Sequence, residues 1–233
     1  MACDGDQSGL IAKMVPTVIV PVMTLGNCVL LPQQLLPLRI FEPRYRKMLK
    51  DALAGNRMFA VSQLDEESLS PDNDEPPCPF TCVGRIVGHV ELPDGTSHLV
   101  LEGLRRARVI KVQRRTPYPR LEIAPVADEP LATADGAMRE VARILALSER
   151  LVNELGPEAA PLLDRLRGLT NQPGALADAA AGHLVEETSV RRALLECLSQ
   201  EKRLRAVADE LARLEARRAI DELGDRTAEP GMN

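Results

Sequence analysis

The stretch LPLRIFEPRYRKML, residues 36–49, contains the sharpest change of local structure in this chain. Pro37 favours an extended backbone before it, so we predict a strand that ends near Ile40. Pro43 suits the first position of a helix, where its missing N–H costs nothing. Glu42 stands just before it, where the positive end of a helix stabilises a carboxylate that can accept hydrogen bonds from free N–H groups. The stretch is therefore predicted to form a strand-to-helix corner.

The helix predicted after this corner has one apolar face. Its apolar residues recur at spacings i, i+3, i+4, i+7 and i+8, namely Tyr45, Met48, Leu49, Ala52 and Leu53. Gly55 follows as a C-terminal stop. Phe41 and Tyr45, two of only five aromatic residues in the chain, are expected in the core beneath the corner.

The residues around this corner, up to about residue 126, are typical of β-structure. They form short runs rich in valine and isoleucine, separated by proline and glycine. The clearest hairpin spans residues 83–112 and turns at Pro93-Asp94-Gly95, where glycine can take a positive φ. We predict a disordered N-terminus over 1–14 and an all-β barrel over 15–126, with the one helix inserted.

The composition changes near residue 127, where alanine, leucine, arginine and glutamate replace the β-branched residues. We predict a linker over 127–136, a helical bundle over 137–223 and a disordered tail over 224–233, which gives an α+β fold class. Two helical stripes carry this prediction: Met138, Val141, Leu145, Val152 and Leu155, then Leu204, Val207, Leu211 and Leu214.

Charge is unevenly distributed in this chain of 233 residues, whose formal net charge is −5. Residues 36–57 and 102–120 are basic, whereas residues 65–75 hold six acids and no base. The longest apolar run is broken by prolines and is too short to span a membrane, and the N-terminus has no apolar signal segment. Five cysteines, an odd number, indicate reduced thiols, so we expect a cytoplasmic protein without a membrane partner.

No motif in the sequence indicates catalysis. Neither G-x-x-x-x-G-K-[ST] nor G-x-G-x-x-G occurs, and no G-x-S-x-G occurs. Cys78, Cys82 and His89 include metal-binding types but lack a fourth ligand, and Phe80, Cys82 and Ile86 instead match one buried strand face. We therefore expect no cofactor, no metal and no enzymatic activity.

Two segments are candidate binding surfaces. Residues 30–38, LLPQQLLPL, are apolar, proline-rich and without clear periodicity, as an exposed apolar surface would be. The basic segment 105–120 could bind RNA, with arginines on phosphates and a tyrosine stacked on a base; the residues concerned are Arg105, Arg106, Arg114, Arg115 and Tyr118. The alternative places Leu104, Ala107, Val109 and Val112 in the core and the arginines on a solvated strand face.

Two quoted segments resemble the N-terminal substrate-binding domain of the Lon family of ATP-dependent proteases: VPVMTLGNCVLLPQQLLPLRIFEPRYRKMLKDAL and VGRIVGHVELPDGTSHLVLEGLRRARV, residues 20–53 and 83–109. The family pattern has the same IFEPRYR and LPDG motifs, and the match covers residues 16 to about 126. Met23-Thr24 stand where Phe-Pro is usual, and Gln33 replaces a glycine. The resemblance implies a PUA-like β-barrel followed by helices.

The same resemblance implies a non-catalytic module, because the family's ATPase and Ser-Lys protease modules have no counterpart in this sequence. The implied partners are unfolded or degron-bearing polypeptide, or a protease or ligase assembly; DNA is not expected, and RNA stays the alternative because PUA-like barrels elsewhere bind it. The candidate polypeptide-binding residues are Met23, Leu25, Leu30, Pro32, Gln33, Leu35, Arg39, Glu42 and Arg44.

Overall fold

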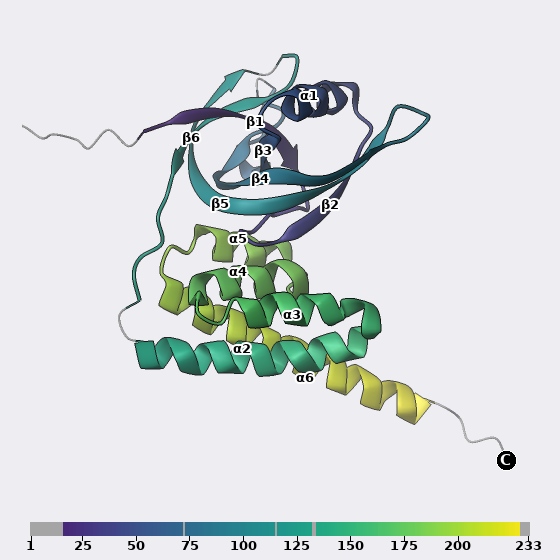
Figure 1. Ribbon diagram of the computed structural model, residues 1–233, viewed down its shortest axis with the longest axis vertical. Coiled ribbons are helices and arrows are strands. Elements are labelled where there is room, and N and C mark those ends of the chain that lie inside the picture. Colours follow the sequence, from purple (N-terminus) through teal and green to yellow (C-terminus); the bar gives the residue numbers. More distant parts are fainter. Residues whose placement is uncertain (1–15, 72, 115, 132–133, 229–233) are drawn as a thin grey trace, which may run out of the picture.

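The computed structural model describes residues 16–71, 73–114, 116–131 and 134–228. It consists of a β-rich half and a helical half that lie against one another, with α4 and α5 next to the strands and α2 and α6 on the far side (Figure 1). The β-rich half contains β1 (Val18–Leu25), β2 (Leu35–Ile40), α1 (Pro43–Ala54), β3 (Met58–Leu64), the short 3-10 helix η1 (Glu66–Ser68), β4 (Pro77–Glu91), β5 (Ser97–Arg114) and β6 (Arg120–Pro125). The helical half contains α2 (Ala134–Leu155), η2 (Pro157–Ala159), α3 (Ala160–Gly168), α4 (Pro173–Leu184), α5 (Thr188–Glu196) and α6 (Gln200–Ala228). The architecture is mixed α+β, as predicted.

The six strands form one sheet in the order β2-β5-β4-β3-β1-β6, and β5 also pairs with β6. The hydrogen-bonded path β5-β4-β3-β1-β6 therefore returns to β5, while β2 pairs with the first part of β5 alone. All pairings are antiparallel except that of β1 with β3. The length of β5 makes this possible, because its first half pairs with β2 and its second half with β6.

The strand-to-helix corner forms where the sequence predicts it. α1 begins at Pro43 and buries Tyr45, Met48, Leu49 and Ala52. Glu42 occupies the N-cap position but makes no capping hydrogen bond through its side chain. The placement of Phe41 in the core is wrong, because its side chain is 60% exposed. Ile40 before it is buried, and successive residues of an extended chain point to opposite sides.

The helical half is organised around two neighbouring parallel helices, α2 and α6. Three ion pairs join the two helices: Arg143–Asp209 (2.8 Å), Arg150–Glu215 and Arg218–Glu154 (3.4 Å). Their residue numbers rise together along α2 and α6, so the two helices run in the same direction. The predicted stripe of α6 is buried at Leu204, Val207 and Leu211. On α2 the prediction is wrong at the two ends of the stripe, since Met138 and Leu155 are exposed, and Ala137, Ile144 and Leu151 are buried instead.

The predicted segment boundaries differ from the observed elements by a few residues. α2 starts at Ala134, inside the predicted linker, and α6 continues to Ala228, into the predicted tail. The predicted disordered N-terminus over 1–14 and residues 229–233 lie outside the described residues.

Candidate functional site

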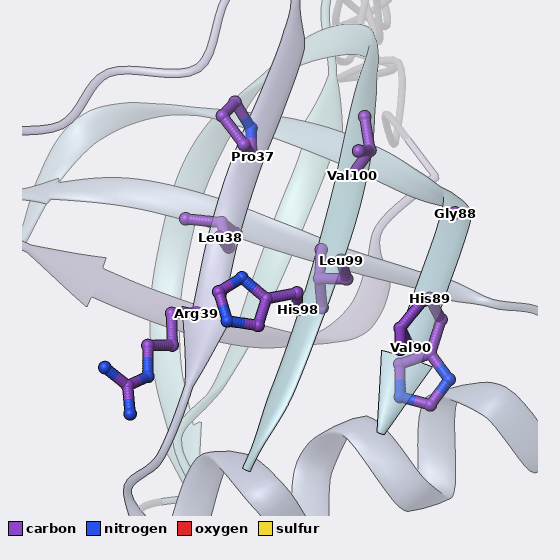
Figure 2. A pocket seen from close by; sticks show the side chains of 9 residues that line it. All are labelled: Pro37, Leu38, Arg39, Gly88, His89, Val90, His98, Leu99 and Val100. Carbon is purple, nitrogen blue, oxygen red and sulfur yellow. The ribbon is translucent and has the colours of Figure 1, made fainter. Parts of the chain in front are cut away.

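An apolar hollow lies on the outward face of β2, β5 and β4 (Figure 2). The strand register places Pro37 opposite Val100 and Val100 opposite Gly88; two residues along, Arg39 lies opposite His98 and His98 opposite Val90. Alternate residues of neighbouring strands share a face, so these six side chains or Cα positions face one way. We call the surface made by Pro37, Arg39, Gly88, Val90, His98 and Val100 the outer β face. The hollow on it has a volume of about 470 Å³.

An irregularity in β4 shapes this hollow. The pairing with β5 shifts between Ile86 and Gly88, so Val87 is an extra residue at that point. Val87 is half exposed and Val90 is 62% exposed, although both are β-branched residues in a strand. Gly88 lacks a side chain, and a Cβ built there would meet Val100 at 3.8 Å, an ordinary contact. The absence of a side chain at Gly88 therefore leaves space in the hollow for a side chain of a ligand.

Arg39 gives the outer β face a positive charge that makes no direct ion pair within the described residues. The Arg39 side chain is exposed and, within the described residues, makes no hydrogen bond or ion pair. Glu102, farther along β5, is already paired with Arg85 and Arg165, each at 3.1 Å. These two arginines lower the pKa of Glu102 in spite of its partial burial. Its carboxylate is therefore not available to Arg39.

Asp94, in the β4–β5 turn, is also engaged locally. Its Oδ1 accepts hydrogen bonds from the backbone N–H of Thr96 at 2.9 Å and from the Thr96 hydroxyl at 2.7 Å. These bonds, with smaller contributions from Arg39 and Arg46, lower the pKa of Asp94. Gly95 completes the turn with a φ of 75°, as the sequence predicts.

The apolar segment 30–38, predicted to be an exposed binding surface, is exposed only at Pro37, because its other residues are buried or half-buried. Of the predicted binding residues, Met23, Leu30 and Pro32 lie in the interior, and Leu25, Gln33 and Leu35 are half-buried. The segment joins the two halves of the molecule: Arg191 of α5 donates to the Val29 carbonyl at 2.6 Å and to Gln34 Oε1 at 2.8 Å. Of the nine predicted polypeptide-binding residues, the structure places only Arg39 on the outer β face.

The turn before β2 is held against β5. Gln33 and Gly103 are joined by a backbone hydrogen bond of 2.8 Å, and Gly103 donates to the Gln34 carbonyl at 2.9 Å. A Cβ at Gly103 would lie 2.0 Å from the Leu31 carbonyl oxygen, so only glycine permits this approach. Gln33 has a φ of 67°, in the left-handed region that favours glycine. This conformation explains why the Lon family pattern has a glycine at the position that Gln33 occupies here.

Glu42 and Arg44 are paired with each other and with the acidic segment. Arg44 contacts Glu75 with both terminal nitrogens, at 2.8 and 2.6 Å, and Glu42 through Nε at 2.9 Å. Hydrogen bonding to Glu75 raises the pKa of Arg44. Glu42 and Arg44 therefore tie Glu75 to the start of α1. Because their charged groups already pair inside the molecule, they are not free to pair with a ligand.

The predicted RNA-binding residues do not form one surface. Arg105 is exposed, but Arg106 is only 4% exposed and Tyr118 only 1%. The Tyr118 hydroxyl donates to Asp51 at 3.1 Å and accepts from Arg120 at 2.9 Å, so its ring cannot stack on a base. Arg114 lies in β5, and Arg115 lies outside the described residues. The prediction is wrong for Arg106 and Tyr118, because both are taken up in the interior.

Arg106 belongs to a buried ionic cluster between the two halves. It contacts Asp178 of α4 and Asp128, both at 2.7 Å, and donates to the Leu195 carbonyl of α5 at 3.1 Å. Arg203 of α6 contacts Asp178 at 3.0 Å and also pairs with Asp128. Burial raises the pKa of Asp178 to about 6 against the opposing effect of the two guanidinium groups. We call Arg106, Asp128, Asp178 and Arg203 the junction cluster.

No arrangement for metal binding is found in the described ranges. No group of three or more His, Cys, Asp or Glu side chains there could hold a metal ion. Cys78, Cys82 and Ile86 are buried in β4, and burial raises the pKa of both thiols. No helix in the part of the chain that the structure describes is both long and apolar enough to cross a membrane.

Sequence reasoning missed two features, the hollow on the surface and the buried partners of Arg106 in the junction cluster. The hollow depends on the register of β2 on β5 and on the irregularity at Val87. The hairpin around Pro93-Asp94-Gly95 could have indicated that β4 and β5 pair with one another. It does not indicate that β2 pairs with the other edge of β5. Asp178 and Arg203 carry no signal that would join them to Arg106.

Comparison with known proteins identifies the family. The family model for the ATP-dependent protease La (LON) substrate-binding domain matches residues 19–213, so the chain belongs to this family. It is 30% identical over 226 residues to Lon protease 2 of Sorangium cellulosum, and 29% identical over 202 residues to the Lon protease of Trichlorobacter lovleyi. These alignments cover 90% and 84% of this chain but only 26% and 24% of the relatives, so the chain spans about a quarter of their length.

Solved structures with similar folds come from the same region of Lon proteins. The N-terminal domain of a Mycobacterium avium complex Lon protease has a TM-score of 0.64 at 21% identity, and covers 84% of this chain and 98% of that one. A Lon N-terminal domain protein from Xanthomonas campestris has a TM-score of 0.58 at 22% identity, and covers 81% and 95%. At these identities the likeness concerns the fold.

Proposed function

We propose that this chain is a non-catalytic substrate-recognition module that binds exposed apolar segments of polypeptides on the outer β face. The observation that carries the proposal is the hollow of about 470 Å³, lined by Pro37, Val90 and Val100 on a Lon substrate-binding fold. Exposed apolar surface of this kind is a common mark of a protein-binding site. Unfolded or degron-bearing polypeptide is the client class, and a protease or ligase assembly is the partner to which it would be delivered.

In this proposal the closed circuit of strands over residues 15–126 is the PUA-like barrel and residues 137–223 are the helical bundle that supports it. Two observations favour the division. The strand circuit closes within the first segment, through the pairings of β5 with β4 and β6. One link to the helices runs through the junction cluster, whose Arg106 lies six residues beyond Val100 along β5, so the cluster includes none of the residues that line the hollow.

Site-specific photocrosslinking tests the proposal. A benzophenone amino acid replaces Val90 on the outer β face or, as a matched control, Ile110, which is also an exposed apolar residue of the sheet. The probe is carboxymethylated α-lactalbumin, which cannot refold. We expect crosslinks from position 90 and far fewer from position 110, reduced by excess unlabelled probe. Equal crosslinking at both positions, or none at 90, would contradict the proposal. An RNA competitor at low salt is expected to leave the crosslink at 90 unchanged.

A further inference from the structure

The charge on the outer β face carries an inference about which polypeptides bind there. Arg39 of β2 lies directly opposite His98 of β5, and both side chains are exposed. Neither makes an ion pair or a side-chain hydrogen bond with a carboxylate among the described residues, and no acidic residue lines the hollow. Figure 2 shows Arg39 extending beyond β2 and His98 projecting from the middle strand beside it. A positive group that is solvated and unpaired is free to pair with a ligand.

Other arginines in and around the sheet are used differently. Arg44 is held by Glu42 and Glu75, Arg85 by Glu102, and Arg106 by Asp128 and Asp178. Their acids are therefore compensated inside the molecule and cannot reach the hollow. Arg39 acts on Asp94 at a distance but contacts no carboxylate in the described residues, so a carboxylate brought by a ligand would form the direct pair that it lacks. Guanidinium–carboxylate pairs are among the stronger polar contacts.

We propose that the outer β face selects polypeptide segments in which an apolar side chain that fills the hollow is accompanied by a side-chain carboxylate that pairs with Arg39. This inference rests on the proposed function and specifies its substrate class. His98 stands opposite Arg39, where a ring N–H can donate to the second carboxylate oxygen.

The shape of the hollow favours a side-chain carboxylate over the carboxylate at the end of a chain. Sites for chain termini use nests of free backbone N–H groups. All nine residues that line this hollow belong to the extended strands β2, β4 and β5, whereas a nest needs successive residues in turn or helical conformations. The face is open and shallow, so an internal segment can pass over it and present its side chains.

The strand register also sets the spacing. Pro37 and Arg39 are two residues apart on one face, about 7 Å along the strand. Residues i and i+2 of an extended segment lie on one side at the same separation. The favoured pattern is therefore an apolar residue and an acidic residue with any one residue between them.

Fluorescence anisotropy with labelled peptides tests the inference. Three peptides share one sequence: the first contains Leu-Ser-Glu, the second Leu-Ser-Gln, and the third Leu-Ser-Glu with an amidated C-terminus. We expect the Glu peptide to bind roughly two- to fivefold more tightly than the Gln peptide, because an exposed ion pair contributes modestly. Amidation is expected to change nothing, and added salt should reduce the difference between Glu and Gln peptides.

The variant Arg39→Gln is expected to remove the preference for Glu over Gln while still binding both peptides. Arg139→Gln, which changes an exposed arginine of α2, a helix on the side of the helical half away from the strands (Figure 1), is the matched control and should keep the preference. Circular dichroism establishes that both variants fold. An unchanged preference in Arg39→Gln overturns the inference and leaves the proposed function standing. A loss of binding on amidation overturns the choice of a side-chain carboxylate, whereas failure of the crosslink at position 90 refutes the proposed function itself.

Discussion

The outer β face and the junction cluster use the same residue type in opposite ways. Arg39 and Arg106 both lie in strands, in basic segments that look alike in the sequence. Arg106 is buried and contacts two carboxylates and a carbonyl, whereas Arg39 is exposed and has no partner in the described residues. The difference teaches that burial and partners, not charge density along the sequence, separate a structural arginine from one free to bind.

The largest expected effect comes from breaking the junction cluster. Asp178→Ala removes a carboxylate that both Arg106 and Arg203 contact, and leaves the two arginines buried. Removing one partner of a buried ion pair typically costs about 3–5 kcal/mol. We expect a loss of this size in the free energy of unfolding, measured with urea. Asp209→Ala removes the exposed partner of Arg143 and should cost far less, because exposed ion pairs contribute little to stability. Similar losses in the two variants would show that the cluster has no special structural role.

Two glycines of the same sheet sharpen the contrast between the regions. Gly103→Ala places a Cβ 2.0 Å from the Leu31 carbonyl oxygen, where the turn before β2 packs against β5. The strain of overpacking is expected to cost about 1–3 kcal/mol. Gly88→Ala adds a methyl group to the open hollow at ordinary contact distance, so the free energy of unfolding should stay within about 0.5 kcal/mol of the parent. Thermal and urea unfolding measure both. Equal destabilisation would mean that the hollow is not open.

A smaller effect is expected in the pH dependence of stability, through His183 of α4, which contacts the start of β2. Burial lowers the pKa of His183 to about 4, and its Nε2 accepts a hydrogen bond from the Leu35 N–H at 3.4 Å. The unfolded chain therefore binds this proton more readily, so stability should fall as the pH drops from about 6.5 towards 4. His183→Gln keeps an acceptor without this titration. Relative to it, the parent should lose up to about 1.6 kcal/mol between pH 6.5 and 5; parallel stability curves would exclude His183 as the cause.

Local structure was predictable because local chemistry determines it. Pro43 after Glu42 fixes the start of α1, and Gly95 fixes the hairpin turn with its positive φ. The burial of Leu30 was not predictable, because it depends on helices more than 140 residues away, as the bond from Arg191 to Val29 illustrates. The role of Arg106 likewise depends on Asp178, 72 residues farther along the chain.

The candidate site was predictable only in part for the same reason. Arg39 was identified, but its neighbours on the outer β face come from three strands, and their register sets which side chains meet. The alternation within β2 already places Pro37 and Arg39 on one face. Nothing in the sequence shows that Val90 and Val100 lie beside them.

Binding of carboxymethylated α-lactalbumin by Val90→Asp, measured against Ile110→Asp, tests the central claim most directly. Both substitutions place a charge at an exposed position of the sheet, so the free energy of unfolding should change little in either. If the outer β face is the polypeptide-binding surface, Val90→Asp weakens binding about tenfold or more, because a charge on the apolar hollow must be desolvated by the client. Ile110→Asp should bind like the parent. Equal affinities for both variants and the parent would contradict the account.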